Sequence, residues 1–72
     1  ALVFQDLHLA SGLSVLENVL LGAYARGLPS DRQEALRLLD ELGISALAQV
    51  RADRLSRGEA QRTAIARALL PR

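Results

Sequence analysis

Three segments of this sequence carry the start signal of a helix, a serine followed three residues later by glutamate or glutamine. The serine hydroxyl accepts a hydrogen bond from a free backbone amide of the first turn, and the longer side chain reaches back to the serine amide. Glycine or proline then follows as a stop signal. The pairs are Ser14–Glu17, Ser30–Gln33 and Ser56–Glu59, and the stops are Gly27 with Pro29, Gly43, and Pro71. These start and stop signals predict three helices, beginning at residues 14, 30 and 57, with a further short helix from Ser45.

Apolar residues recur at intervals of three and four between these signals, which is the period of a helix with one buried face. The predicted buried positions are Val15, Leu16, Val19, Leu20, Ala23 and Tyr24 in the first helix, Ala35, Leu38, Leu39 and Leu42 in the second, and Ala60, Ala64, Ile65, Ala68 and Leu69 in the last. Residues 1–5 form a short apolar run that is predicted to be the remnant of a strand.

The length and composition indicate a single small globular domain. A chain of 72 residues buries roughly 60% of its unfolded surface, so its independent stability is marginal. Without cysteine, disulfides and thiolate metal sites are excluded, and His8, the single histidine, is interpreted as a loop residue. The longest apolar run, residues 19–25, is far shorter than the roughly 20 residues that span a bilayer. No secretory signal is recognisable at the N-terminus.

The segment from Leu55 to Glu59 is the first candidate for chemistry. A helix N-terminus presents free amides and a partial positive charge, and anions bind there. A serine at the cap adds a donor, and Gly58 lets a ligand oxygen approach the backbone without meeting a Cβ. Ordinary helix capping requires the same residue types. On these residues alone, phosphate binding and simple capping both stay open.

The stretch LSRGEAQRTAIARAL, residues 55–69, closely resembles the signature motif of ATP-binding cassette (ABC) ATPases and the helix that follows it. Val3-Phe4-Gln5-Asp6 resembles the Q-loop of the same family, and LSVLENV, residues 13–19, is similar to the segment after it. Only 49 residues separate Gln5 from Leu55, which is similar to the helical subdomain of transporter ATPases. The resemblance covers essentially the whole chain.

This resemblance implies a mainly α fold: a small helical subdomain of three to four helices with an N-terminal strand remnant, cut from an α/β P-loop ATPase. It divides the single partial domain into the Q-loop region (1–13), the helical subdomain (14–54) and the signature motif with its helix (55–72). The Walker A and Walker B motifs are absent from the sequence. Residues 1–72 alone are therefore expected neither to bind ATP tightly nor to hydrolyse it.

Functional roles follow from the resemblance, position by position. Gln5 corresponds to the glutamine that contacts Mg²⁺ or the attacking water and senses the γ-phosphate. Ser56, Arg57, Gly58 and Glu59 form the signature motif, in which Ser56 and the Gly58 backbone would contact ATP bound to the opposite subunit. Arg57 stands where the family has glycine, and Glu59 stands where it has glutamine; Glu59 is expected to complete the capping box with Ser56. Gln61 and Arg62 match the pair after the motif, where surface salt bridging is an equally good interpretation.

The resemblance also implies partners and a location. ATP and Mg²⁺ are the expected cofactors of the intact parent protein. The partners are a second ATPase subunit, arranged head to tail, and transmembrane permease subunits, on the cytoplasmic face of the membrane; no nucleic acid is expected. The first helix and the loop before it correspond to the region that meets the membrane subunit. Leu7, Leu9, Leu13 and Tyr24 are candidates to line that groove, or simply to close the small core.

Two other functional classes compete with this interpretation. Net charge is only +1, but residues 51–72 carry six arginines against two acidic residues, as in a helix-turn-helix DNA-binding module. Arg57, Arg62 and Arg67 are spaced by five residues, however, which places them on different sides of a helix. The second competitor is a free-standing helical interaction module.

Overall fold

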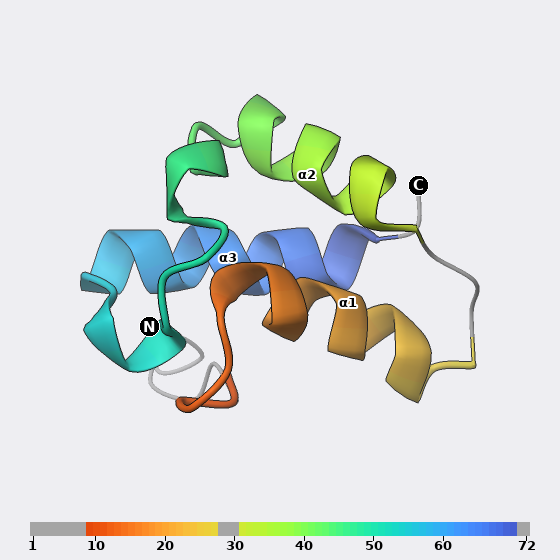
Figure 1. The fold of residues 1–72 in the computed structure, drawn as a ribbon, viewed down its shortest axis with the longest axis horizontal. Helices are drawn as coiled ribbons and strands as arrows, with labels where there is room; N and C mark the ends of the chain where they lie inside the picture. The colour runs from red at the N-terminus through yellow and green to blue at the C-terminus, as the bar shows by residue number, and fades with distance from the viewer. Residues whose placement is uncertain (1–8, 28–30, 71–72) are drawn as a thin grey trace.

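The computed structural model describes residues 9–27 and 31–70 and is mainly helical over these residues, as predicted. Its elements are the helices α1 (Val15–Ala25), α2 (Arg32–Glu41) and α3 (Arg57–Leu69) and the short 3₁₀ helices η2 (Ser45–Leu47) and η3 (Ala52–Arg54). Helices α1 and α3 run in the same direction and pack along each other, and α2 covers them (Figure 1). The predicted strand remnant lies outside the described residues.

The helix starts largely follow the sequence signals. The predicted capping boxes at Ser14 and Ser56 are both present. At the start of α1 the Ser14 hydroxyl accepts a hydrogen bond from the Glu17 amide at 3.1 Å, and the Glu17 carboxylate accepts one from the Ser14 amide at 2.8 Å. The prediction that Ser30 caps the second helix was wrong. Asp31 is the N-cap of α2 and accepts a hydrogen bond from the Glu34 amide, because its carboxylate caps equally well and also favours the positive end of the helix dipole.

The helix ends confirm two of the glycine stops. Gly27 and Gly43 adopt φ values of 69° and 77°, a left-handed conformation that glycine adopts without a Cβ clash. Helix α3 ends at Leu69, and Leu70 is extended, as expected for a residue that precedes proline. Pro29 and Pro71 themselves lie outside the described residues.

A continuous apolar core joins the three helices. Its members are fully or almost fully buried: Val15, Leu16, Val19, Ala23, Ala35, Leu38, Leu39, Ile44, Ala48, Ala66 and Leu70. Thr63 is buried among them, and its hydroxyl is satisfied because it donates to the Glu59 carbonyl at 2.9 Å.

Two predicted core assignments were wrong. Tyr24 is 79% exposed, and Thr63 and Ala66 of α3 and the following Leu70 are buried in place of the predicted stripe. Ile65 and Leu69 from that stripe are 48% and 45% exposed. Helix α3 is apolar on more than one side, so its own sequence does not fix which side faces the core.

Helices α1 and α3 approach closely at Gly22. A Cβ at this position would lie 2.2 Å from Cγ of Arg67 and 3.1 Å from its carbonyl oxygen. The Gly22→Ala variant is therefore expected to lower the free energy of unfolding by about 1–3 kcal/mol, because the helices must separate to admit the methyl group. Urea unfolding followed by circular dichroism measures this loss. Gly12→Ala is the matched control, since a Cβ at Gly12 meets nothing within 4 Å, and equal stabilities for the two variants would contradict the close contact.

Candidate functional site

The start of α3 is built as the sequence predicted. The Ser56 hydroxyl accepts a hydrogen bond from the Glu59 amide at 3.2 Å, and the Glu59 carboxylate accepts one from the Ser56 amide at 2.9 Å. The Glu59 side chain therefore turns back toward the N-cap, where its carboxylate accepts the hydrogen bond of the Ser56 amide. The next amides, those of Arg57 and Gly58, belong to the first turn, whose N–H groups have no carbonyl partner within an α-helix.

Gly58 has no evident structural reason to be glycine. It lies in regular helix, and a Cβ there would come no closer than 3.4 Å to Nη1 of Arg62, the flexible end of a side chain. A Cβ at this position would therefore be tolerated, and its absence leaves the backbone of the first turn open. Arg57 and Arg62 are exposed on the same first two turns, so the surroundings are cationic.

The segment that leads into Ser56 is held by backbone hydrogen bonds to the loop before α1. The amides of Val15 and Leu16 donate to the carbonyls of Val50 and Ala48 at 2.9 and 3.0 Å. In the opposite direction, the amides of Ala52 and Asp53 donate to the carbonyls of Leu13 and Ser11 at 2.9 and 3.2 Å. Ser14 and Arg51 form an antiparallel bridge at the centre. We call this pairing of residues 11–16 with 48–53 the ladder; it fixes the start of α1 beside the approach to α3.

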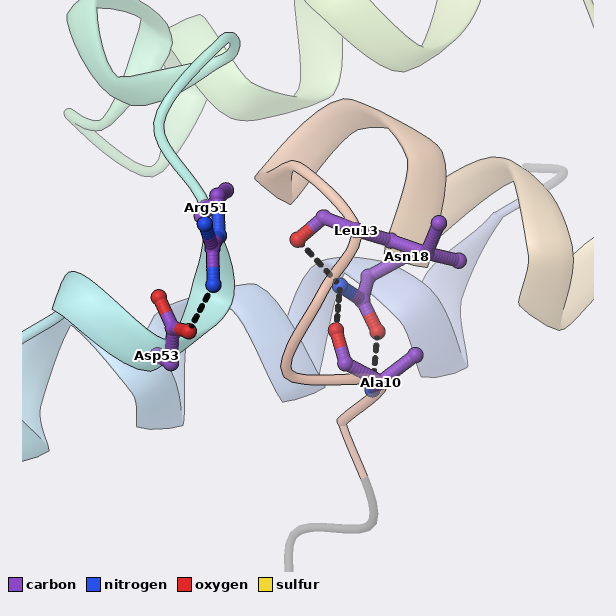
Figure 2. A network of polar contacts seen from close by, with 5 residues as sticks. All are labelled: Ala10, Leu13, Asn18, Arg51 and Asp53. Carbon is purple, nitrogen blue, oxygen red and sulfur yellow. Dashed lines mark hydrogen bonds and ion pairs between the residues drawn. The ribbon is translucent and has the colours of Figure 1, made fainter.

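Asn18 holds the α1 side of the ladder in place (Figure 2). Its side chain is 1% exposed. Its Oδ1 accepts from the Ala10 amide at 2.7 Å, and its Nδ2 donates to the carbonyls of Ala10, Leu13 and Ser14 at 3.1, 3.3 and 3.0 Å. On the other side, Arg51 and Asp53 form an ion pair across the start of η3. Asn18 was not predicted from the sequence, although a polar residue on a predicted buried face is a signal for such a role.

A shallow apolar groove of about 440 Å³ lies along the exposed side of α1. We call it the α1 groove; its lining residues are Leu13, Glu17, Leu20, Leu21 and Tyr24. Leu13 and Tyr24, two of the four candidates named from the sequence, are among these lining residues, while contact of the groove with a membrane subunit stays a prediction. Leu9 is not part of the lining, and Leu7 lies outside the described residues. Leu21, which was not predicted from the sequence, is 44% exposed; it lies four residues after Glu17 and three before Tyr24 in α1, which places these groove residues on one helical face.

The structure does not bring the remaining predicted features into the site at the start of α3. Gln5 lies outside the described residues. No group of three or more His, Cys, Asp or Glu side chains within residues 9–27 and 31–70 is arranged to hold a metal ion. Over the same ranges, none of the helices has the length and apolar character needed to cross a membrane. Arg67 lies against Gly22 of α1, so it does not extend a basic face formed by Arg57 and Arg62.

Comparison with known proteins assigns this sequence to a family. The family model described as "ABC transporter" matches residues 1–72. The chain belongs to the ABC transporter family. No solved structure matches it at a significant level.

Curated relatives of this family member are ATP-binding proteins. It is 48% identical over 80 residues to the phosphonates import ATP-binding protein PhnC of Frankia casuarinae, an alignment that covers 97% of the chain and 32% of the relative. It is also 48% identical to PhnC of Lactiplantibacillus plantarum, covering 96% of the chain and 31% of the relative. The lipoprotein-releasing system ATP-binding protein LolD 1 of Rhodopirellula baltica is 50% identical over 70 residues, with 94% and 31% covered. The chain thus spans about a third of the length of the curated relatives it matches.

Proposed function

We propose that residues 1–72 supply the helical subdomain and signature motif of a transporter's ATP-binding subunit. In this proposal the start of α3 contacts the terminal phosphate of ATP held by a second, head-to-tail subunit. The observation that carries the proposal is the free first turn of α3, where Ser56 caps the helix and Gly58 leaves the backbone open. Such a turn favours a bound phosphate.

The charges around this turn support the same role. Because Glu59 accepts a hydrogen bond from the Ser56 amide, its carboxylate is directed toward the cap. Arg57, in place of the family's glycine, adds an exposed cation beside the free amides. A guanidinium suits phosphate oxygens, so we assign Arg57 a supporting phosphate contact. Gln5 is proposed to sense Mg²⁺ and the γ-phosphate when the nucleotide is bound.

The remaining parts of the ATPase are proposed to lie in a longer polypeptide, because the matched relatives are about three times as long. The exposed Ile65 and Leu69 of α3, four residues apart, form an apolar strip. We propose that this strip packs on the remainder of the ATPase domain, which would explain why it is apolar but not buried in residues 1–72. Hydrolysis would then require those parts, so residues 1–72 alone would be inactive.

The α1 groove is the proposed contact with a membrane subunit on the cytoplasmic face. An apolar groove with one aromatic wall fits an amphipathic helix. The relatives include a phosphonate importer subunit and a lipoprotein-releasing subunit, so this segment is shared between systems with different cargo. The groove is accordingly proposed to transmit force, while the choice of cargo lies elsewhere.

Replacing Tyr24 by alanine tests the groove. The test protein is a full-length chimera in which residues 1–72 replace the matching 31% of the LolD 1 relative, assayed with the membrane subunits of that system. The variant is expected to bind these subunits about tenfold more weakly, because an aromatic wall of the groove is lost. Surface plasmon resonance measures the affinity.

Gln33→Ala, an exposed position on α2, is the control for this experiment and should bind like the parent chimera. Unchanged affinity of the Tyr24→Ala variant would show that the membrane subunit binds another surface.

A further inference from the structure

Arg26 joins the ends of α1 and α3. It is the C-cap residue of α1, and its Nε donates to the Gly22 carbonyl of the same helix at 3.2 Å. Its two terminal nitrogens cross to the last turn of α3. Nη1 donates to the Ala68 carbonyl at 3.4 Å, and Nη2 donates to the Arg67 carbonyl at 3.3 Å and to the Leu70 carbonyl.

These contacts supply donors to the carbonyls at the C-terminal end of α3. The last carbonyls of a helix have no intrahelical donor and carry a partial negative charge. A guanidinium meets both conditions at once, because it is planar, permanently charged and carries five donors in a fixed fork. One edge of the fork binds α1 while the other binds α3, an arrangement that a single ammonium group cannot reproduce.

Arg26 completes the attachment of α1 at its second end. The ladder holds the start of α1 to residues 48–53, just before α3. Gly22 allows the middle of the contact to close tightly. Arg26 then fixes the C-terminal ends of the two helices. The exposed side of α1, which carries the groove, is thus connected through three contacts to the helix that begins at Ser56.

We propose that Arg26 is a positioning residue that makes α1 and α3 move as one body, so that displacement of the α1 groove reaches Ser56 and Gly58. This inference rests on the proposed function of both sites. Without the fork, α1 can pivot on the ladder, and part of its movement is absorbed before it reaches α3. Arg26 itself is exposed, so its loss leaves the apolar core intact.

The test uses the full-length LolD chimera with its membrane subunits. The measured quantity is the coupling ratio, which we define as the ATPase rate with the membrane subunits divided by the rate without them. Arg26→Ala is expected to lower this ratio about threefold or more, the size typical of a residue that carries coupling between sites. Arg26→Lys, which keeps the charge but not the fork, should lower it as well. Arg32→Ala, an exposed arginine of α2, should leave it unchanged.

The outcomes separate this inference from the proposed function. If Tyr24→Ala lowers the coupling ratio and Arg26→Ala does not, the groove proposal stands and the role of Arg26 is refuted. If neither variant lowers it, the groove proposal itself is refuted. Full retention of the ratio by Arg26→Lys would show that charge alone suffices, and would overturn the assignment to the fork. Thermal unfolding of each chimera, with midpoints close to the parent, attributes a lowered ratio to lost coupling.

Discussion

Replacing Asn18 by alanine is expected to lower the free energy of unfolding by about 3 kcal/mol. The side chain is 1% exposed and makes four hydrogen bonds to the backbone of Ala10, Leu13 and Ser14. Alanine removes the partner of these groups where water has little access, and an unsatisfied buried polar group costs about 1–3 kcal/mol. Because a chain of this size has a total stability of only about 4–11 kcal/mol, the loss is a large fraction of it.

Urea unfolding of the 72-residue chain, followed by the helical circular dichroism signal, measures the Asn18→Ala effect. Gln33→Ala changes an amide side chain of similar chemistry at an exposed site and should shift stability by no more than about 0.5 kcal/mol. A similarly small shift for Asn18→Ala would mean that water replaces the amide in the loop, and that the loop does not depend on this side chain.

Local signals in the sequence were sufficient to place the helices. A capping box involves residues only three positions apart, and a glycine stop involves a single backbone conformation, so neither depends on the rest of the fold. The exception, at α2, has the same local character. Ser30 and Asp31 are adjacent and both are good N-caps, so the sequence could not determine which of them begins the helix.

The buried face of α3 could not be predicted for a different reason. This helix has alanine or larger apolar residues on several sides, so periodicity does not single out one face. Packing against α1 decides the outcome: Thr63, Ala66 and Leu70 are buried, and Ile65 and Leu69 stay exposed. The proposed strip on α3 is therefore visible only when the fold is known.

The contacts that connect α1, which carries the groove, to α3, which begins after Ser56, could not be predicted from the sequence either. Arg26 donates to carbonyls 41 to 44 residues away, and the acceptors are backbone groups, which have no sequence signature. The same holds for the ladder between residues 11–16 and 48–53. Leu13 and Tyr24, by contrast, were among the candidates to line a groove, because the family resemblance implied a contact with a membrane subunit in this region.

Replacing Gly58 by alanine is expected to separate stability from activity. The 72-residue chain should become more stable by about 0.5 kcal/mol, because alanine has the higher helix propensity and reduces the freedom of the unfolded chain. The new Cβ finds only the flexible end of Arg62 at 3.4 Å, so no clash offsets this gain. The full-length LolD chimera should nevertheless lose about tenfold or more of its ATPase rate, since a displacement of the phosphate by about 1 Å is enough for such a loss.

Urea unfolding and steady-state ATPase assays measure the two effects of Gly58→Ala, and light scattering with ATP reports whether the chimera still dimerises on nucleotide. Gly12→Ala is the matched control: it also adds a methyl group at an unstrained glycine with open surroundings, and it should leave the ATPase rate unchanged. A Gly58→Ala chimera that turns over ATP and dimerises like the parent would show that Gly58 serves only the helix. The missing side chain would then need another reason, because regular helix at this position favours alanine over glycine.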